Sequence, residues 1–570
     1  MSVKGRLFFF LCLLGVFCIV SVSHAETVPI PSRDRIDNLD RVFEVPEPKS
    51  SPELVFPEMK GTKAPPSVEG MFIFLNRIEI TGNTVFTTEE LLAPYKNLFN
   101  TKIPAKKVFE ISQELTVKYG KAGYVLSNVV VPRQDVDEED AVVKLIVTEG
   151  YVDNVDYEGD EELLAKMQGR LEYAENEIIS SRPANVRKVI RALLILRDIP
   201  GLKLSSTLSA SEAHSGAANL TIRLEQKYVD GSAKVDNRGT DSAGPVQYTA
   251  SFNFNGLTGV GSQDRITYRQ ADQAQEYLNI FYEHSHQLES GTRLYGSFAY
   301  GASDKLDNDF TKIFDYESKS ETLKLGLSYP IIRQREKNLS FELDFESRNS
   351  YSYILSETNS KDRVRKLRAG FNWDAIDSTG GMTQVLGGIT TGLDVFGATN
   401  FSPSSSRSNV PANSFKFNLY ASRTQNLPYQ FSLYAAVDSQ WAEVPLYSGE
   451  EFAVGGTGFG RAYDSGAISG EVGCSAIGEI RRNFQLHEKI TIQPYAFMDW
   501  GWVKNVKPAA GTEKESDLAS LGAGMRFYPT IPSMLGDDRI YLDVQWARPL
   551  VKLPGVHLVD NIFFNFTYSF

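Results

Sequence analysis

Cysteine is nearly absent from this chain of 570 residues, which contains only three. Two of them, Cys12 and Cys18, fall within the first 25 residues, so Cys474 alone remains in the rest of the sequence. A single cysteine cannot form an internal disulfide, even in an oxidising compartment. We therefore predict no disulfide framework and expect Cys474 to be a small filler on a strand.

Motifs of catalysis and nucleotide binding are also missing. The sequence has no G-x-S-x-G, no H-E-x-x-H and no phosphate-binding loop. His284 and His286 share one face of a predicted strand, but no third metal ligand is suggested nearby, so a solvated or luminal pair is expected. We predict that the protein is not an enzyme and has neither a cofactor nor a metal site.

The chain lacks a basic tract and a long apolar segment. It has 59 Lys and Arg against 71 Asp and Glu, a formal net charge of -12. An acidic chain of this kind is a poor candidate for binding nucleic acid. After the first 25 residues, no apolar run reaches the roughly 18 residues of a membrane-spanning helix. If the chain spans a membrane, a closed β-barrel is the remaining way to satisfy its backbone in lipid.

The first 25 residues read as a secretory signal peptide. Lys4 and Arg6 precede the apolar run Leu7–Val20, and a small-residue cleavage site follows at Ala25. Residues 26–70 are rich in proline and predict an extended segment. Within it, apolar residues at helical spacing predict a short amphipathic helix over 33–45, although a surface helix or a disordered segment would fit the same three residues, Ile36, Leu39 and Phe43.

Residues 71–227 contain one pattern twice. In the first copy, strands are predicted at 72–80, 124–131 and 142–147 and helices at 88–99 and 104–121. In the second copy, strands are predicted at 151–157, 202–208 and 219–224 and helices at 161–171 and 185–197. We predict two small α+β domains, 71–149 and 150–227, each with a three-stranded sheet. An extended client could add to an exposed sheet edge as another strand.

From residue 228 to 570 the sequence alternates between apolar and polar residues. In residues 246–255, for example, Tyr248, Phe252 and Phe254 point one way while Asn253 and Asn255 point the other. The same period of two recurs around 341–346, 415–421 and 542–546, and carboxylates lie on the polar face. Alternation with a charged interior and aromatic exterior favours a transmembrane antiparallel β-barrel over a soluble sandwich.

A glycine-rich loop, Gly455–Asp464, carries Arg461, and the stretch Phe497–Asp499 follows some strands later. The glycines allow a tight backbone, and the guanidinium can bind a carboxylate bidentately. The segment 460–463 resembles the Val-Arg-Gly-Tyr/Phe signature, and Phe497–Asp499 the Phe-x-Asp signature, of the outer-membrane barrel superfamily that contains the barrel insertases and the two-partner secretion transporters.

This resemblance implies the candidate site. In that superfamily the arginine lies at the tip of the sixth extracellular loop, which folds into the lumen and pairs with the aspartate on an inward-facing strand. Arg461 and Asp499 would form this latch, and its supporting residues would be Phe459, Gly460, Tyr463 and Phe497. The chain departs from the signature at Gly460, where a branched residue is usual, and at Ala462, where glycine is usual.

Two further stretches extend the resemblance. Residues 78–86 and 192–201 resemble periplasmic polypeptide-transport-associated (POTRA) modules. At the end of the chain, Ile562, Phe564, Phe566, Tyr568 and Phe570 alternate with mostly polar residues and resemble the C-terminal targeting signal of outer-membrane barrels. The resemblance implies a barrel of sixteen strands, and transporter relatives place an N-terminal plug helix inside the barrel.

The sequence is thus identified as resembling the two-partner secretion transporters of the haemolysin-activator, FhaC-like family. Such a protein would lie in the outer membrane of a Gram-negative bacterium, contact its lipid, depend on the barrel-assembly machinery and export a large secreted partner without a cofactor or nucleic acid. Two alternatives remain open from the residues: an insertase that assembles other barrels, and a passive pore or adhesin-like barrel.

Overall fold

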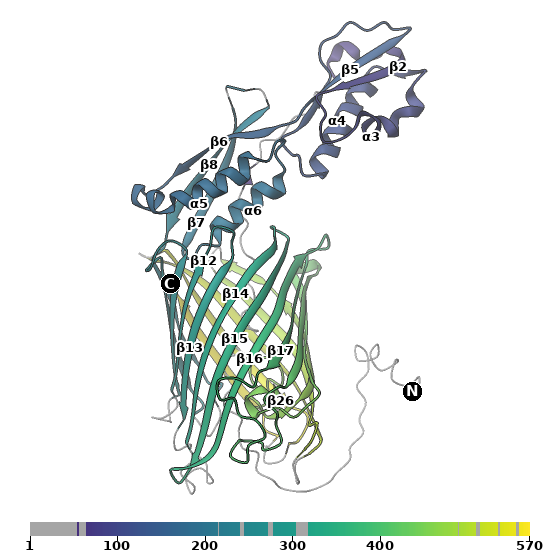
Figure 1. Ribbon diagram of the computed structural model, residues 1–570. Coiled ribbons are helices and arrows are strands. Elements are labelled where there is room, and N and C mark those ends of the chain that lie inside the picture. Colours follow the sequence, from purple (N-terminus) through teal and green to yellow (C-terminus); the bar gives the residue numbers. More distant parts are fainter. Residues whose placement is uncertain are drawn as a thin grey trace.

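The computed structural model describes residues 54–55, 64–211, 213–214, 216–239, 244–271, 278–303, 317–487, 490–508, 513–533, 536–553 and 558–570. Two α+β modules lie in series at one end of a large β-barrel (Figure 1). The predicted signal peptide, residues 1–25, and the predicted helix at 33–45 lie outside the described residues.

The first module follows the first copy of the predicted pattern. It comprises β2 (Phe72–Thr81), α3 (Thr88–Leu92), the 3-10 helix η3 (Ala93–Leu98), β3 (Thr101–Pro104), α4 (Lys106–Lys121), β4 (Asn128–Val130) and β5 (Ala141–Thr148). Helix α3 begins at a capping box, because the Thr87 side chain accepts from the Glu90 backbone and the Glu90 side chain accepts from that of Thr87. Helix α4 buries Val108, Ile111 and Leu115, at intervals of three and four residues, against the sheet.

The second module repeats this plan. It comprises β6 (Tyr151–Glu158), α5 (Glu161–Ile179), α6 (Val186–Arg197), β7 (Leu202–Ala210) and β8 (Ala217–Gln226). Asp160 caps α5 and Asn185 caps α6, each by accepting a backbone N–H of the first turn. The two helices pack their apolar faces on one side of the sheet, with Leu193 and Leu220 among the fully buried side chains.

Both sheets have four strands, so the prediction of three was wrong. In the first module the order is β3-β2-β5-β4, where β3 occupies residues that were predicted as loop and helix start. In the second the order is β1-β7-β8-β6, where β1 (Leu54–Val55) comes from the proline-rich segment and pairs in parallel with β7. The missing strands are short or distant in sequence, so periodicity could not reveal them.

The barrel is closed and antiparallel. Its strands are β9 (Val229–Asp236), β10 (Gln247–Asn255), β11 (Ser262–Ala271), β12 (Leu278–Gln287), β13 (Arg293–Ser303), β14 (Glu317–Arg333), β15 (Lys337–Ile354), β16 (Glu357–Ile376), β17 (Gly381–Gly392), β18 (Phe415–Asn426), β19 (Phe431–Ala442), β22 (Val472–Arg482) with β23 (Phe484–His487), β24 (Ile490–Lys504), β25 (Glu515–Ser533), β26 (Gly536–Pro549) and β27 (Asn561–Ser569). Because β22 and β23 both pair with β24, they count as one strand, and the barrel has 16 strands, as the family resemblance implied.

The predicted alternation is present in the barrel wall. On β15, Phe341 is exposed on the outer face while Asp344 and Glu346 are buried on the inner face. On β26, Val544 is exposed and Gln545 is buried. An apolar exterior and a charged interior are typical of a transmembrane β-barrel.

The barrel closes between its first and last strands. Strand β27 pairs with β9 over five positions, from Asn565 opposite Asp236 to Ser569 opposite Ser232. Beyond this ladder, the Asn237 side chain donates to the Ile562 carbonyl at 2.9 Å and accepts the Phe564 N–H at 2.7 Å. A side chain thus continues the backbone pairing where the ladder ends.

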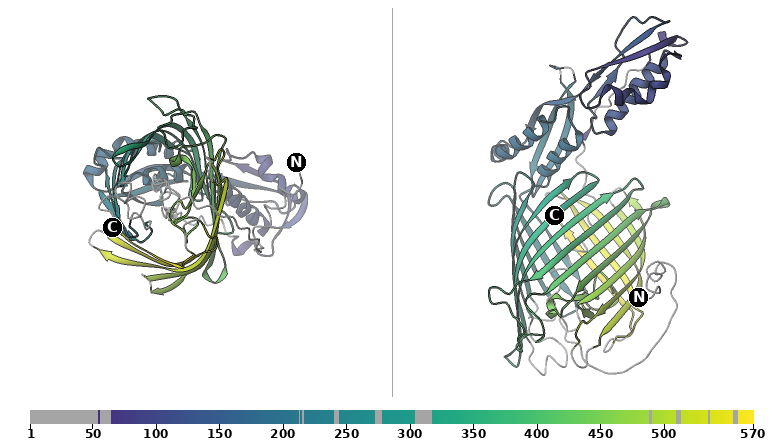
Figure 2. Two further views of the ribbon diagram at one scale, coloured as in Figure 1. Left: turned by 90° about the horizontal axis from the view of Figure 1, so that it is seen from below. Right: turned by 45° about the vertical axis from the view of Figure 1, so that its right-hand side comes forward.

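The second module sits directly on one rim of the barrel (Figure 2). Arg333, at the end of β14, binds both carboxylate oxygens of Asp198, which follows α6, at 2.6 Å. Arg170 of α5 donates to the Val260 carbonyl, in the turn before β11, at 3.0 Å. Bidentate pairing of this kind is geometrically specific, so these contacts define the seat of the module on the rim. Among the described residues, no helix is both long and apolar enough to cross a membrane.

Candidate functional site: an arginine loop in the barrel lumen

Residues 443–471, which connect β19 to β22, form a largely buried connection, and we call them the lumen loop. The loop contains the 3-10 helix η5 (Ser448–Glu450) and a small hairpin of β20 (Phe452–Val454) and β21 (Ile468–Gly470). Its apolar side chains pack against inward-facing residues of the wall, among them Phe497 and Leu518. The loop therefore folds back into the lumen, as the family resemblance implied.

The glycines of the predicted motif shape the tip of the lumen loop. The N–H of Gly455 donates to the Phe459 carbonyl at 3.0 Å, and the N–H of Tyr463 donates to the Gly460 carbonyl at 2.9 Å. Gly460 has a φ of +71°, and a Cβ there would lie 2.7 Å from the Leu518 side chain. The departure from a branched residue at this position therefore has a local cause, since the left-handed backbone and the close wall both favour glycine.

The guanidinium of Arg461 binds Glu479 of β22 rather than Asp499, so the prediction of a guanidinium pair with Asp499 was wrong. Its Nη1 lies 2.7 Å from Oε2 of Glu479. The same carboxylate also accepts from Arg481 at 2.5 Å and from Arg526 of β25 at 2.6 Å. All four side chains are buried, and one carboxylate thus serves three arginines.

Asp499 of β24 contacts the latch residue through the backbone. Its Oδ2 accepts the N–H of Arg461 at 3.1 Å, and its Oδ1 accepts the Ser520 hydroxyl. The side chain of Asp499 is almost completely buried. Asp499 therefore fixes where the loop backbone lies, while Glu479 neutralises the charge that the loop brings.

The aromatic residues predicted as support lie around this pair. The Arg461 guanidinium stands 4.7 Å from the centroid of the Phe497 ring, a cation–π arrangement. Phe459 and Tyr463 are buried in the same cluster. The Tyr463 hydroxyl accepts the N–H of Val551 at 3.0 Å and lies 3.1 Å from the carbonyl oxygen of Ala519.

Two contacts tie the loop tip to the ends of the barrel sheet. Arg238, just after β9, donates to the Arg461 carbonyl at 2.8 Å. Asn561, the first residue of β27, donates to the Ala462 carbonyl at 3.0 Å. The lumen loop consequently contacts β27 and the segment that directly follows β9, where the barrel closes. Ala462 itself is buried, so alanine fits where the signature has glycine.

The C-terminal aromatic residues lie on the closing strand. Phe566 is exposed on the outer face, and the Tyr568 hydroxyl donates to Asp538 of β26. Phe570 exchanges backbone hydrogen bonds with Gly231 of β9, at 3.0 and 3.2 Å. These residues therefore take part in closing the barrel, whatever their part in targeting.

The two strand histidines have separate neighbours. Nδ1 of His284 lies 2.9 Å from Asp264, whereas Nε2 of His286 lies 3.4 Å from Arg170 of the second module. In the part of the chain that the structure describes, no three His, Cys, Asp or Glu side chains group as metal ligands would.

Sequence reasoning missed Glu479, Arg481 and Arg526. The signal that could have found them is the alternation itself, because all three occupy inward-facing positions beside the outward-facing Ile480 and Met525. A carboxylate among inward arginines indicates an internal ion cluster, but the pairing of β24 with β22 and β25 could not be read from one sequence.

Known proteins resemble this chain in sequence and fold. A model of the family described as haemolysin secretion/activation protein ShlB/FhaC/HecB matches residues 216–527, and a model of the ShlB-type POTRA domain matches residues 73–150. The heme/hemopexin transporter protein HuxB of Haemophilus influenzae (strain 86-028NP) is 24% identical over 497 residues, which is 85% of this chain and 86% of the relative.

Solved structures of CdiB share the fold. CdiB from Escherichia coli superposes with a TM-score of 0.70 at 19% identity, covering 92% of this chain and 94% of that one. CdiB from Acinetobacter baumannii gives a TM-score of 0.63 at 16% identity, with 94% and 97% covered. The closed barrel of 16 strands, the POTRA modules and the matched family model place the chain in the class of two-partner secretion transporters. Within that class, the chain belongs to the ShlB/FhaC/HecB family of haemolysin secretion/activation proteins.

Proposed function

We propose that this transporter captures one large secreted protein at its POTRA modules and passes it, unfolded, through the barrel lumen. The observation that carries the proposal is the lumen loop, which is held inside the barrel by charged side chains rather than by apolar packing alone. A charged anchor holds a segment in one position and still permits an exchange of partners.

Capture would use the exposed edges of the module sheets. Strand β6 forms one edge of the second sheet and β4 forms one edge of the first. An extended client could pair with such an edge through backbone hydrogen bonds, which gives affinity without demanding a particular sequence. The periplasm offers no nucleotide fuel, so folding of the client outside the cell would drive its transit.

Arg461, Glu479 and Asp499 would form the latch of the lumen loop. Removing one partner of a desolvated ion pair costs about 3 to 5 kcal/mol, because the other charge stays buried. The latch is thus strong enough to hold the resting loop and weak enough to be exchanged for contacts with a client.

The same features support a proposed location. The apolar exterior would contact the lipid of the outer membrane of a Gram-negative bacterium, with the modules in the periplasm and the lumen loop entering the barrel from the cell-surface side. Phe566, Tyr568 and Phe570 would be read by the barrel-assembly machinery during biogenesis. Residues 71–149, 150–227 and 228–570 would be the two POTRA domains and the barrel, and the protein would act by binding and conduction rather than by catalysis.

Depletion of the protein tests this function against its main rival, a barrel insertase. In the same cells, the proteins of the medium and cell surface would be quantified beside the outer-membrane barrels. Loss of one large secreted protein with unchanged barrels supports a dedicated transporter. A broad fall in barrels would instead assign the chain to barrel assembly.

A further inference from the structure

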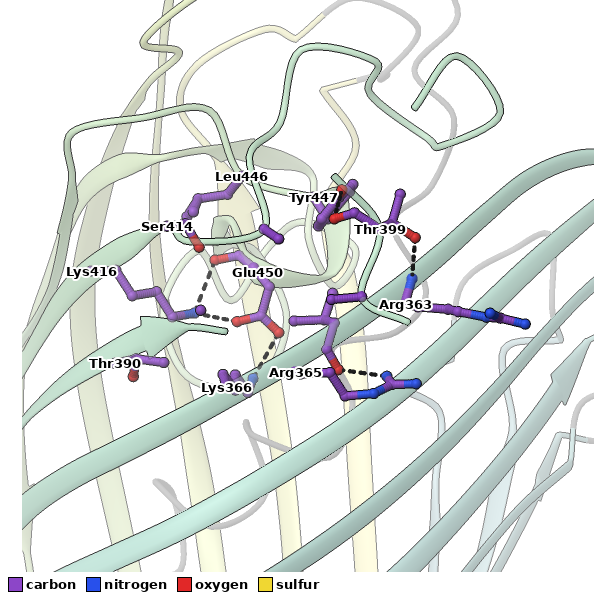
Figure 3. A pocket seen from close by; sticks show the side chains of 14 residues that line it. Arg363, Arg365, Lys366, Thr390, Thr399, Ser414, Lys416, Leu446, Tyr447 and Glu450 are labelled. Atoms are coloured by element: carbon purple, nitrogen blue, oxygen red, sulfur yellow. Dashed lines mark hydrogen bonds and ion pairs between the residues drawn. The ribbon is translucent and has the colours of Figure 1, made fainter. Parts of the chain in front are cut away.

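The lumen loop is held at a second place, where the signs of the charges on loop and wall are reversed. Glu450, at the end of η5, is buried in a pocket lined by wall residues, by the connection between β17 and β18, and by Leu446 and Tyr447 of the lumen loop (Figure 3). Its carboxylate lies 2.7 Å from Nζ of Lys366 and 2.7 Å from Nζ of Lys416. Here the loop contributes the anion and the wall contributes the cations.

The backbone around Glu450 is bound as well. Lys416 Nζ and Gln440 Nε2 each donate to the Glu450 carbonyl at 3.1 Å. Arg348 Nη1 donates to the Gly449 carbonyl at 3.2 Å and lies 3.6 Å from the Glu450 carboxylate. Glu450 is therefore surrounded by donors in the manner of a bound ligand.

These donors belong to a cluster of inward-facing side chains, which we call the basic cage: Lys324 of β14, Arg348 of β15, Lys366 of β16 and Lys416 of β18. Glu346 of β15 lies among them, 2.9 Å from Lys366 and 3.5 Å from Lys324. Arg363 and Arg365 also line the pocket, but their guanidinium groups point away from Glu450 (Figure 3).

The loop carboxylate serves two cations of the cage. Lys366 and Lys416 both bind Glu450, so both lose a buried anion when Glu450 leaves. Among the described residues, Lys416 forms its salt bridge with Glu450 alone. Buried cations that lose their partner pay a desolvation penalty, which a new anion relieves.

We propose that the basic cage is a carboxylate-binding site of the lumen, occupied by Glu450 while the loop is in place and by acidic side chains of an extended client when the loop leaves. The part concerning the client rests on the proposed function. The part concerning the site rests on the cage geometry alone, and the ligand class follows from the carboxylate that the cage already holds.

Replacement of the internal ligand tests the site itself. Glu450→Ala leaves room for a free carboxylate, so acetate should restore the protection of amides 448–454 from hydrogen exchange in the full-length, lipid-reconstituted protein. We expect exchange in this segment to rise at least about tenfold in the variant and to return toward the wild-type rate in acetate but not in chloride at equal ionic strength. The wild type should not respond to acetate.

Two variants make the assignment specific. Glu450→Ala combined with Lys366→Gln and Lys416→Gln should no longer respond to acetate, because the cage cations are gone. Arg461→Ala, whose missing group is a cation, should respond to methylguanidinium and not to acetate. If acetate protects Glu450→Ala no more than the wild type, or equally well without the two lysines, the cage is not a carboxylate site.

A pore measurement tests occupancy by a client-like chain and does not require Glu450→Ala to fold. Hexaglutamate would be added to the Glu450→Gln protein, in which Lys366 and Lys416 lack the loop carboxylate, in a planar lipid bilayer, with hexalysine as the control of opposite charge. We expect hexaglutamate to reduce the current and the Lys366→Gln, Lys416→Gln background to abolish this block. Absence of block, or equal block in both backgrounds, would overturn the assignment to the client. Failure of the transport function itself would appear separately, in the depletion experiment.

Discussion

Two parts of the barrel wall hold the lumen loop through ion pairs, and the charges on wall and loop are reversed between them. On β22, β24 and β25, the wall supplies the carboxylate of Glu479 and the loop supplies Arg461. On β15, β16 and β18, the wall supplies cations and the loop supplies Glu450. The first wall can satisfy itself without the loop, because Arg481 and Arg526 also bind Glu479.

This difference determines what each part of the wall loses when the lumen loop leaves. When Arg461 leaves, Glu479 keeps two arginines. When Glu450 leaves, Lys416 loses its salt bridge and the cage retains one carboxylate. The ion cluster on β22, β24 and β25 therefore stays paired after Arg461 leaves, whereas the basic cage favours a replacement anion after Glu450 leaves. Hydrogen exchange of amides 455–463 reports on the first anchor and that of amides 448–454 on the second.

Glu479→Gln should have the largest effect on the first anchor, because three buried arginines lose their common carboxylate. Loss of one partner of a buried pair costs about 3 to 5 kcal/mol, so exchange of amides 455–463 should accelerate by about a hundredfold or more. Amides 448–454 should change much less, since the cage is intact.

Glu515→Gln is the matched control. Glu515, at the start of β25, forms an exposed pair with Lys504 at 3.4 Å. Exposed pairs contribute about 0 to 1 kcal/mol, so this variant should leave both loop segments close to wild type. Equal effects of the two variants would show that Glu479 does not hold the loop.

Gly460→Ala should have the second-largest effect on the exchange of amides 455–463. A side chain at φ +71° is strained, and the new methyl group would lie 2.7 Å from Leu518 and 3.1 Å from the Gly455 backbone. Left-handed backbone costs about 1 to 2 kcal/mol for alanine, and overpacking adds about 1 to 3.

Gly478→Ala tests whether this effect is local. Gly478 lies on β22, and a methyl group there would have no other atom within 4 Å, so alanine should leave the exchange of amides 455–463 unchanged. If Gly460→Ala behaved like Gly478→Ala, the tight turn would not determine the position of Arg461.

Much of the fold could be predicted from the sequence because its periodicities are local. The alternation on β15 and β26 predicted which side chains face outward, and the helix faces of the modules appeared at their proper spacing. Strands β1 and β3 were missed because a strand of two to four residues is too short to show a period of its own. Its pairing partner lies elsewhere in the chain and leaves no local signal.

The candidate site was predicted only in part. The signature located Arg461, Asp499 and Phe497, all of which the structure brings together. It did not reveal that Glu479 takes the guanidinium, because that contact depends on the register between β22 and β24. Glu450 was missed for the same reason. Its partners come from three strands, and only the folded barrel brings their side chains together around Glu450.

Asp499→Asn should weaken the first anchor less than Glu479→Gln. The carboxylate accepts the Arg461 N–H and the Ser520 hydroxyl, and the amide can keep one of these two bonds. A hydrogen bond to a charged group contributes about 1.5 to 3 kcal/mol, so exchange should rise by about ten- to a hundredfold. If Asp499→Asn exceeded Glu479→Gln, Asp499 would be the charge partner of Arg461, contrary to the geometry described above.

Lys366→Gln should have the smallest effect, and it acts on the other anchor. Glu450 keeps Lys416 at 2.7 Å, and Glu346 keeps Arg348 at 3.3 Å, so neither carboxylate loses all its cations. We expect amides 448–454 to exchange about tenfold faster, which corresponds to about 1.4 kcal/mol, and amides 455–463 to remain protected. Lys319→Gln, on β14 beyond the cage, is the control and should change neither segment. If Lys366→Gln instead released both segments together, the two walls would not be independent anchors, and the lumen loop would leave its seat as a single unit.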